Sequence, residues 1–241
     1  MYQAFLDAAL ILLTMRVPFD SRNPYRNSVT QSGFGTFGGP HVLDLVARVA
    51  SCALKACWYQ KWIVHQRLRP EEFGARVHNT KTGAATYPIH QALLTSPALD
   101  IVAKRHNTYL LPQAYPEGAP MHPSYPAGHA AIAGACVTVL KALFHEPQVI
   151  VEPVVSSSTG LAIVPYSGYD RLTVGGELDK LAANISIGRN LAGIHYYSDG
   201  INGMKLGEEV ALSVLRDMRE CFNELFRGFS LTKFDGTTVT V

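Results

Sequence analysis

The chain has 241 residues, which is enough for one large domain or two small ones around a buried core. Hydrophobic residues make up 47% and charged residues 17%, so the composition excludes an intrinsically disordered chain. The formal net charge is only +2, and no basic stripe alternates with aromatic residues, so we expect no nucleic-acid partner. No apolar run reaches the roughly 18 residues of a membrane span, which predicts a soluble protein without a membrane partner and leaves its compartment open.

The first half of the chain is predicted to be helical on both sides of one long connection. Residues 2–15 carry helix-like patterning, whereas residues 18–40 are rich in Pro, Gly, Ser and Asn. Apolar residues then keep a helical period through residues 42–64. Because proline disfavours helix at the residue before it, Arg69 should lie at or just beyond the end of this helix, which Pro70 terminates.

The middle of the chain contains a second connection. Residues 93–106 form a weaker helical pattern interrupted at Pro97. Residues 112–126 hold five prolines and predict a stiff extended loop, which runs into an apolar helix at residues 130–144.

Helices also dominate the last third. Residues 147–168 predict short strands or an irregular excursion, and helical patterning follows at residues 174–192 and 202–226. The tail, residues 229–241, predicts a small hairpin with an Asp-Gly turn. We therefore expect an all-α fold, a mainly helical bundle with minor short β hairpins, in which residues 1–241 form a single domain.

Lys61 and Arg69 form the first of three short cationic clusters. They lie eight residues apart, or about 12 Å along an ideal helix. Both side chains can reach one point only if the helix ends between them. The alternative is a solvated basic face, since His65 and Arg67 stand nearby.

The second cluster is Pro126-Ala127-Gly128-His129, where the proline-rich loop meets the apolar helix. Such a helix start presents backbone N–H groups to an anion, and Gly128 lets the anion approach the main chain closely. His129 could act as an acid or base near neutral pH. The alternative is a helix-capping turn with an incidental histidine.

The third cluster is Arg189, His195 and Asp199. If the segment is helical, the histidine and the aspartate face each other, so that the carboxylate fixes the imidazole tautomer. The alternative is a buried histidine satisfied by a neighbour. Taken together, the three clusters predict a site for a tetrahedral oxyanion.

The three clusters match the three-part signature shared by vanadium-dependent haloperoxidases and type-2 phosphatidic acid phosphatases. The segments KWIVHQRLRPEEFG, HPSYPAGHA and GRNLAGIHYYSDG resemble the algal and cyanobacterial vanadium bromoperoxidases in particular. The seven-residue gap between Lys61 and Arg69 also fits that branch. The resemblance covers nearly the whole chain but only the C-terminal part of the family's usual length. It implies a vanadium haloperoxidase or acid phosphatase-like fold that forms the vanadate-binding half of such an enzyme.

The resemblance implies a set of residues that hold the cofactor, vanadate with V(V). His195 would be the axial ligand that bonds the vanadium directly. Lys61, Arg69 and Arg189 would neutralise the vanadate oxygens, and the N–H of Gly128 would add a hydrogen bond. Phosphate, also a tetrahedral oxyanion, could occupy the same site.

It also implies residues that take part in the reaction. His129 would bond the apical hydroxide and shuttle protons, Lys61 would polarise bound peroxide, and Asp199 would orient the axial histidine. His122 stands where algal bromoperoxidases have histidine and chloroperoxidases an aromatic residue, which favours bromide. Trp58 could line the halide approach, although a core position is the stronger alternative.

Ala127 departs from the family pattern, which has serine there. A hydroxyl hydrogen bond to an oxyanion contributes about 1.5–3 kcal/mol. Its loss should weaken vanadate binding roughly 10- to 100-fold if nothing replaces it.

The resemblance therefore implies a vanadate-dependent bromoperoxidase. Such an enzyme oxidises bromide with hydrogen peroxide to a hypobromite-like species, which halogenates small organic acceptors. An acid phosphatase-type phosphomonoesterase that uses the same pocket is the alternative enzyme. A helical interaction or storage subunit with a vestigial site is the non-enzymatic alternative. Exposed helix faces predict a homo-oligomer, at least a dimer.

Overall fold

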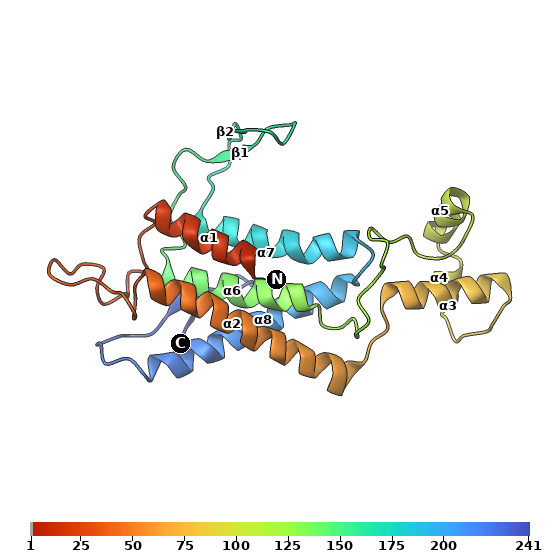
Figure 1. The fold of residues 1–241 in the computed structure, drawn as a ribbon, viewed down its shortest axis with the longest axis horizontal. Coiled ribbons are helices and arrows are strands. Elements are labelled where there is room, and N and C mark those ends of the chain that lie inside the picture. The colour runs from red at the N-terminus through yellow and green to blue at the C-terminus, as the bar shows by residue number, and fades with distance from the viewer. Residues whose placement is uncertain (1) are drawn as a thin grey trace.

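A computed structural model describes residues 2–241 and shows a bundle of long helices around one central helix. The central helix α6 (Gly128–Leu143) packs against α2 (Gly39–Tyr59), α7 (Val174–Leu191) and α8 (Tyr197–Arg219) (Figure 1). The first helix, α1 (Gln3–Thr14), lies against α2 and also contacts α6. The all-α class with minor hairpins is confirmed.

α6 lies at the centre because its sequence is apolar apart from His129, Thr138 and Lys141. All its residues except His129 are buried, and the buried ammonium of Lys141 is paired with Asp179 of α7 at 2.9 Å. Glycines on α8 bring the two helices close together. A Cβ placed on Gly207 would lie only 2.0 Å from the carbonyl oxygen of Ala131, and one on Gly203 would lie 2.9 Å from the Cβ of Ala130.

The predicted connection between the helix at 42–64 and Pro70 is partly wrong. α2 ends at Tyr59 and continues as a short π-helix, η1 (Gln60–His65), which stops where Gln66 turns left-handed with a φ of 45°. Pro70 does not end this helix. It begins the next one, α3 (Pro70–Thr82), where its missing N–H and fixed φ suit the first position.

α3 itself was not predicted from the sequence. Its only buried residues are Pro70 and Val77, so its apolar period is too weak to stand out. Proline at the first position followed by Glu71 and Glu72 was the available signal, since acidic side chains favour a helix N-terminus.

The prediction for the last helix is wrong at both ends, because α8 spans residues 197–219 and not 202–226. Its start is fixed by Asp199, whose carboxylate accepts the main-chain N–H of Tyr196. The bounds of α7 agree with the predicted helix to within one residue, and α6 begins two residues before its predicted start. The proline at 97 begins α5 (Pro97–His106), after the single turn of α4 (Gln91–Leu94).

Two antiparallel hairpins complete the structure. β1 (Val154–Ser156) pairs with β2 (Ile163–Pro165) on an arm that projects from the bundle (Figure 1). β3 (Ser230–Thr232) pairs with β4 (Thr238–Thr240) at the C-terminus, which confirms the predicted tail hairpin. Within residues 2–241, no helix is both long and apolar enough to cross a membrane.

Candidate oxyanion site

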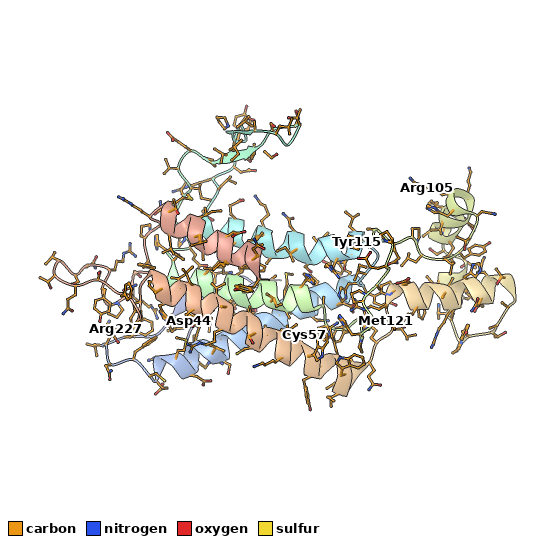
Figure 2. All side chains as sticks on the ribbon, viewed as in Figure 1. Asp44, Cys57, Arg105, Tyr115, Met121 and Arg227 are labelled. Atoms are coloured by element: carbon orange, nitrogen blue, oxygen red, sulfur yellow. The ribbon has the colours of Figure 1, made fainter. Side chains whose placement is uncertain are left out.

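The three cationic clusters come together at one end of the bundle. α6 and α8 begin there, α7 ends there, and the loop that follows α5 passes across it (Figure 1). Cys57, Tyr115 and Met121 mark this end of the bundle among the side chains in Figure 2. The candidate site is therefore built from segments that are far apart in the sequence.

Lys61 lies on η1 and is completely buried. Its ammonium donates to the carbonyl oxygens of Pro123 and Ser124, the second at 3.0 Å. Burial and the neighbouring charge of Arg69 lower the pKa of Lys61 to about 8. The solvated basic face considered for this cluster is thus wrong, since Arg69 is buried as well.

Arg69 precedes α3 and connects two of the clusters. Its guanidinium donates to the carbonyl oxygens of His122 at 2.7 Å and Ile194 at 3.1 Å. It also reaches Nε2 of His195 at 3.1 Å and Nδ1 of His122 at 2.9 Å. Burial and the charge of Arg189 lower the pKa of Arg69 to about 10.

Arg189 lies in the last turn of α7. Its Nε is buried and has no hydrogen-bond partner among residues 2–241. With Tyr115 and Met121 it lines a cavity of about 580 Å³, and burial lowers its pKa. A buried guanidinium nitrogen without a partner is a donor for a ligand, because native proteins rarely leave such a group unsatisfied.

The N-terminus of α6 supplies backbone donors. Its N-cap residue, Ala127, has no side-chain oxygen to cap the helix, and its own N–H donates to the carbonyl of Asp199 at 2.9 Å. The N–H groups of Gly128, His129 and Ala130 have no hydrogen-bond acceptor in the described chain. Burial and the charge of Arg189 lower the pKa of His129 to about 4, so its ring is neutral at pH 7.

His195 and Asp199 are in contact although only the aspartate is helical. His195 lies two residues before α8, and its Nδ1 is 3.0 Å from Oδ2 of Asp199. With Asp199 on Nδ1 and the guanidinium of Arg69 on Nε2, the network assigns the proton to Nδ1 and leaves Nε2 as the acceptor. Burial outweighs the hydrogen bond to Asp199 and lowers the pKa of His195 to about 4, so the ring is neutral.

Two residues of this network, Ser124 and Arg67, were not predicted as site residues from the sequence. The buried hydroxyl of Ser124 donates to Oδ2 of Asp199, and Arg67 donates to Oδ1 at 2.7 Å. Burial raises the pKa of Asp199, but hydrogen bonds from His195, Ser124 and the N–H of Tyr196 outweigh burial and lower it overall. Both residues lie within the segments that resemble the family, yet their shared partner, Asp199, is more than seventy positions away from each.

Trp58 is not a core residue, which corrects the stronger of the two alternatives considered for it. Its side chain is 42% exposed, and its ring centroid lies 4.7 Å from that of His122. Burial, followed by the charges of Arg69 and Lys61, lowers the pKa of His122 to about 4. The two rings therefore form a neutral, partly exposed aromatic pair beside the cations.

This arrangement is suited to an oxyanion. Lys61 and Arg69 are buried and Arg189 is half-buried, and the charge of Arg189 helps to lower the pKa of both other cations. The nearby carboxylate, Asp199, is already paired with Arg67. Within residues 2–241, no group of three or more His, Cys, Asp or Glu side chains is placed to hold a metal ion.

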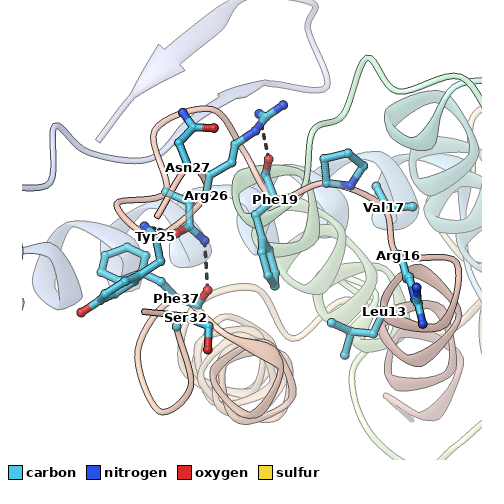
Figure 3. A pocket seen from close by; sticks show the side chains of 12 residues that line it. Leu13, Arg16, Val17, Phe19, Tyr25, Arg26, Asn27, Ser32 and Phe37 are labelled. Carbon is cyan, nitrogen blue, oxygen red and sulfur yellow. Dashed lines mark hydrogen bonds between the residues drawn. The ribbon is translucent and has the colours of Figure 1, made fainter. Parts of the chain in front are cut away.

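A second cavity, of about 550 Å³, lies away from these residues, between the end of α1 and the 18–38 connection (Figure 3). The guanidinium of Arg26 donates to the carbonyl of Phe19 on its wall at 3.0 Å. None of the predicted site residues lines this cavity.

Comparison with known proteins agrees with the resemblance read from the clusters. Residues 43–224 match the family described as the VCPO second helical-bundle domain. The chain belongs to the vanadium haloperoxidase family. It is 42% identical to a vanadium-dependent bromoperoxidase of Corallina officinalis, in an alignment that covers all of this chain and 44% of the relative. It is 38% identical to one of Ascophyllum nodosum, over 90% of this chain and 42% of that relative.

The fold of this chain is also found in a solved member of the family. The homohexameric second vanadate-dependent bromoperoxidase (AnII) from Ascophyllum nodosum superposes with a TM-score of 0.85 at 29% identity. The match covers 95% of this chain and 44% of that one. The chain thus spans less than half the length of the relatives it matches.

Proposed function

We propose that this chain is the vanadate-binding part of a vanadate-dependent bromoperoxidase, which oxidises bromide with hydrogen peroxide to a hypobromite-like species that halogenates small organic acceptors. One observation carries the proposal: Nε2 of a buried, neutral His195 lies among buried cations at the uncapped start of α6. The names of the relatives, which match over 100% and 90% of the chain, support this activity over others that use the same pocket.

The proposed cofactor is vanadate, and the residues present fit it. His195 would supply the one direct ligand, since its Nε2 is an acceptor. Lys61, Arg69 and Arg189 would balance the charge of the oxygens, and the unpartnered Nε of Arg189 and the free N–H of Gly128 would donate to them. Bound vanadate supplies a Lewis acid that activates peroxide without a change in oxidation state.

The remaining residues have proposed roles in proton transfer and in halide access. Burial and the charge of Arg189 keep His129 neutral at pH 7, so it is available as a base, and a bound anion that offsets this charge would raise its pKa and let it accept a proton and return it. Asp199 holds the Nδ1–H of His195, which fixes the direction of its Nε2. The exposed Trp58 and the adjacent His122 would line the approach of bromide.

The test is bromination of a phenol-red-type dye by the purified chain with bromide and peroxide, with and without vanadate. We expect activity only with vanadate, and none in His195→Ala. Exposed His106→Ala, on α5, is the control and should keep the activity. No bromination at saturating vanadate would refute the proposal. Phosphomonoester hydrolysis much faster than bromide oxidation would favour the phosphatase alternative, because phosphate fits the same donors.

We also propose that the chain forms a homo-oligomer, at least a dimer, and acts without nucleic acid or membrane partners. The exposed apolar side chains Trp62, Ile63 and Val64 on η1 support self-association, as does the homohexameric state of the solved relative. Light scattering on the purified chain tests this, and a monomer would refute it.

A further inference from the structure

Arg67 lies on the far side of Asp199 from the imidazole of His195. Its guanidinium donates to Oδ1 of Asp199 at 2.7 Å, whereas His195 and Ser124 contact Oδ2. The same nitrogen of Arg67 reaches the hydroxyl of Ser198 at 2.9 Å. The two oxygens of the carboxylate thus have separate partners, and Arg67 is the charged partner of the first.

The position of Arg67 is fixed by both its backbone and its side chain. The left-handed Gln66 ends η1 immediately before Arg67. The carbonyl oxygen of Arg67 accepts the N–H of Ser124 at 2.9 Å. Its guanidinium lies 4.6 Å from the ring centroid of Tyr125, in a cation–π contact. Arg67 therefore connects the segment before α3, the loop before α6 and the start of α8.

Arg67 also separates Asp199 from water. A cavity of about 490 Å³ opens on this side and is lined by Arg67, Tyr196 and Ser198, together with Leu68 and Phe73. Asp199 does not line it, and the carboxylate is completely buried. The side chain of Arg67 is 41% exposed, so it stands between the cavity and the carboxylate.

We propose that Arg67 is a positioning residue of the oxyanion site: it holds the carboxylate of Asp199 so that His195 keeps its Nδ1–H on Oδ2 and its Nε2 toward the oxyanion. The inference rests on the proposed function, since it assigns Nε2 as the ligand atom. Removing Arg67 leaves Oδ1 buried without its charged partner and lets water reach it from the cavity. The carboxylate then turns toward water, and the imidazole loses its fixed acceptor.

The experiment measures oxyanion affinity by calorimetry with inorganic vanadate and, separately, inorganic phosphate, on Arg67→Gln and Arg67→Lys. Arg76→Ala is the matched control, because Arg76 also lies over a tyrosine ring, at 5.3 Å, but contacts no residue of the site. Thermal denaturation reports folding. Nitrogen-15 NMR of the histidine rings, recorded without any oxyanion, reports the tautomer and order of His195.

We expect Arg67→Gln to weaken vanadate binding about 10- to 100-fold, the usual effect of removing a partner that orients a metal ligand. The Nδ1 signal of His195 should shift or broaden, and Arg67→Lys should restore most of the affinity because it returns the charge to Oδ1. Arg76→Ala should leave the vanadate affinity and the His195 signal unchanged.

Unchanged affinity and an unchanged His195 signal in a folded Arg67→Gln would overturn the inference, whether or not the chain brominates the dye. A chain that binds vanadate but does not brominate refutes the proposed function and leaves this measurement valid. A chain that binds neither vanadate nor phosphate overturns both the proposed function and the role of Arg67.

Discussion

Gly207→Ala tests how closely α6 and α8 are packed. The added Cβ would lie 2.0 Å from the carbonyl oxygen of Ala131 and 2.7 Å from the N of Ala135, both of them main-chain atoms of α6. Ordinary contact begins at 3.4 Å, so the helices must separate locally by about 1.4 Å, the difference between 3.4 and 2.0 Å. No flexible side chain can absorb this displacement.

The expected cost follows from two opposing effects. Overpacking a close-packed interface costs about 1–3 kcal/mol, and a clash with main-chain atoms belongs at the upper end. Alanine recovers about 1 kcal/mol through its higher helix propensity. The net loss of stability is about 2 kcal/mol, or roughly 4–8 °C in Tm for a chain of this size.

Thermal and urea denaturation of the two variants Gly207→Ala and Gly188→Ala decide the question. Gly188 also lies within a helix, α7, but an added Cβ there meets nothing within 4 Å. The Gly188→Ala chain should gain up to about 1 kcal/mol of stability, and this gain measures the effect of helix propensity by itself. A Gly207→Ala chain as stable as Gly188→Ala would refute the close approach of α6 and α8.

Three further predictions concern the oxyanion site. The pKa of Lys61 is about 8, so this side chain loses its charge above that pH, and sulfate affinity measured by calorimetry should fall as the pH rises through 8. A Lys61→Met chain should not show this fall in affinity. A wild-type affinity that does not change with pH would contradict the prediction. Ala127→Ser should tighten vanadate binding roughly 10- to 100-fold, since the hydroxyl adds about 1.5–3 kcal/mol, and equal affinities in the two chains would show that no oxygen of the anion lies within its reach. Arg189→Met should weaken phosphate binding by a similar factor, about 10-fold or more, with little change in Tm, because its Nε supports no other group; a large drop in Tm would contradict this.

The sequence was sufficient to predict the helices that carry a strong apolar pattern. α6 is mostly apolar, and α7 keeps a clear period, so both were placed to within two residues. α3 was missed because it buries little, and the start of α8 was misplaced because it depends on the capping contact of Asp199.

The site was predicted only as far as local spacing allows. Lys61, Arg69 and His195 were recognised from short segments, and the structure brings them together. Ser124 and Arg67 act on Asp199 across 75 and 132 positions of the chain. No local pattern encodes such contacts, because they depend on how the loop before α6 crosses the start of α8.

The loop over the site has a shape that depends on the cations beneath it. Lys61 and Arg69 donate to the main-chain carbonyls of His122, Pro123 and Ser124, in a segment without regular secondary structure. A neutral substitution at either position therefore removes a charge and releases the loop at the same time, so protease cleavage near Met121 should rise together with the loss of affinity. The Nε of Arg189 makes no hydrogen bond to this loop. Substituting Arg189 therefore measures the electrostatic attraction for the anion separately from the folding of the loop.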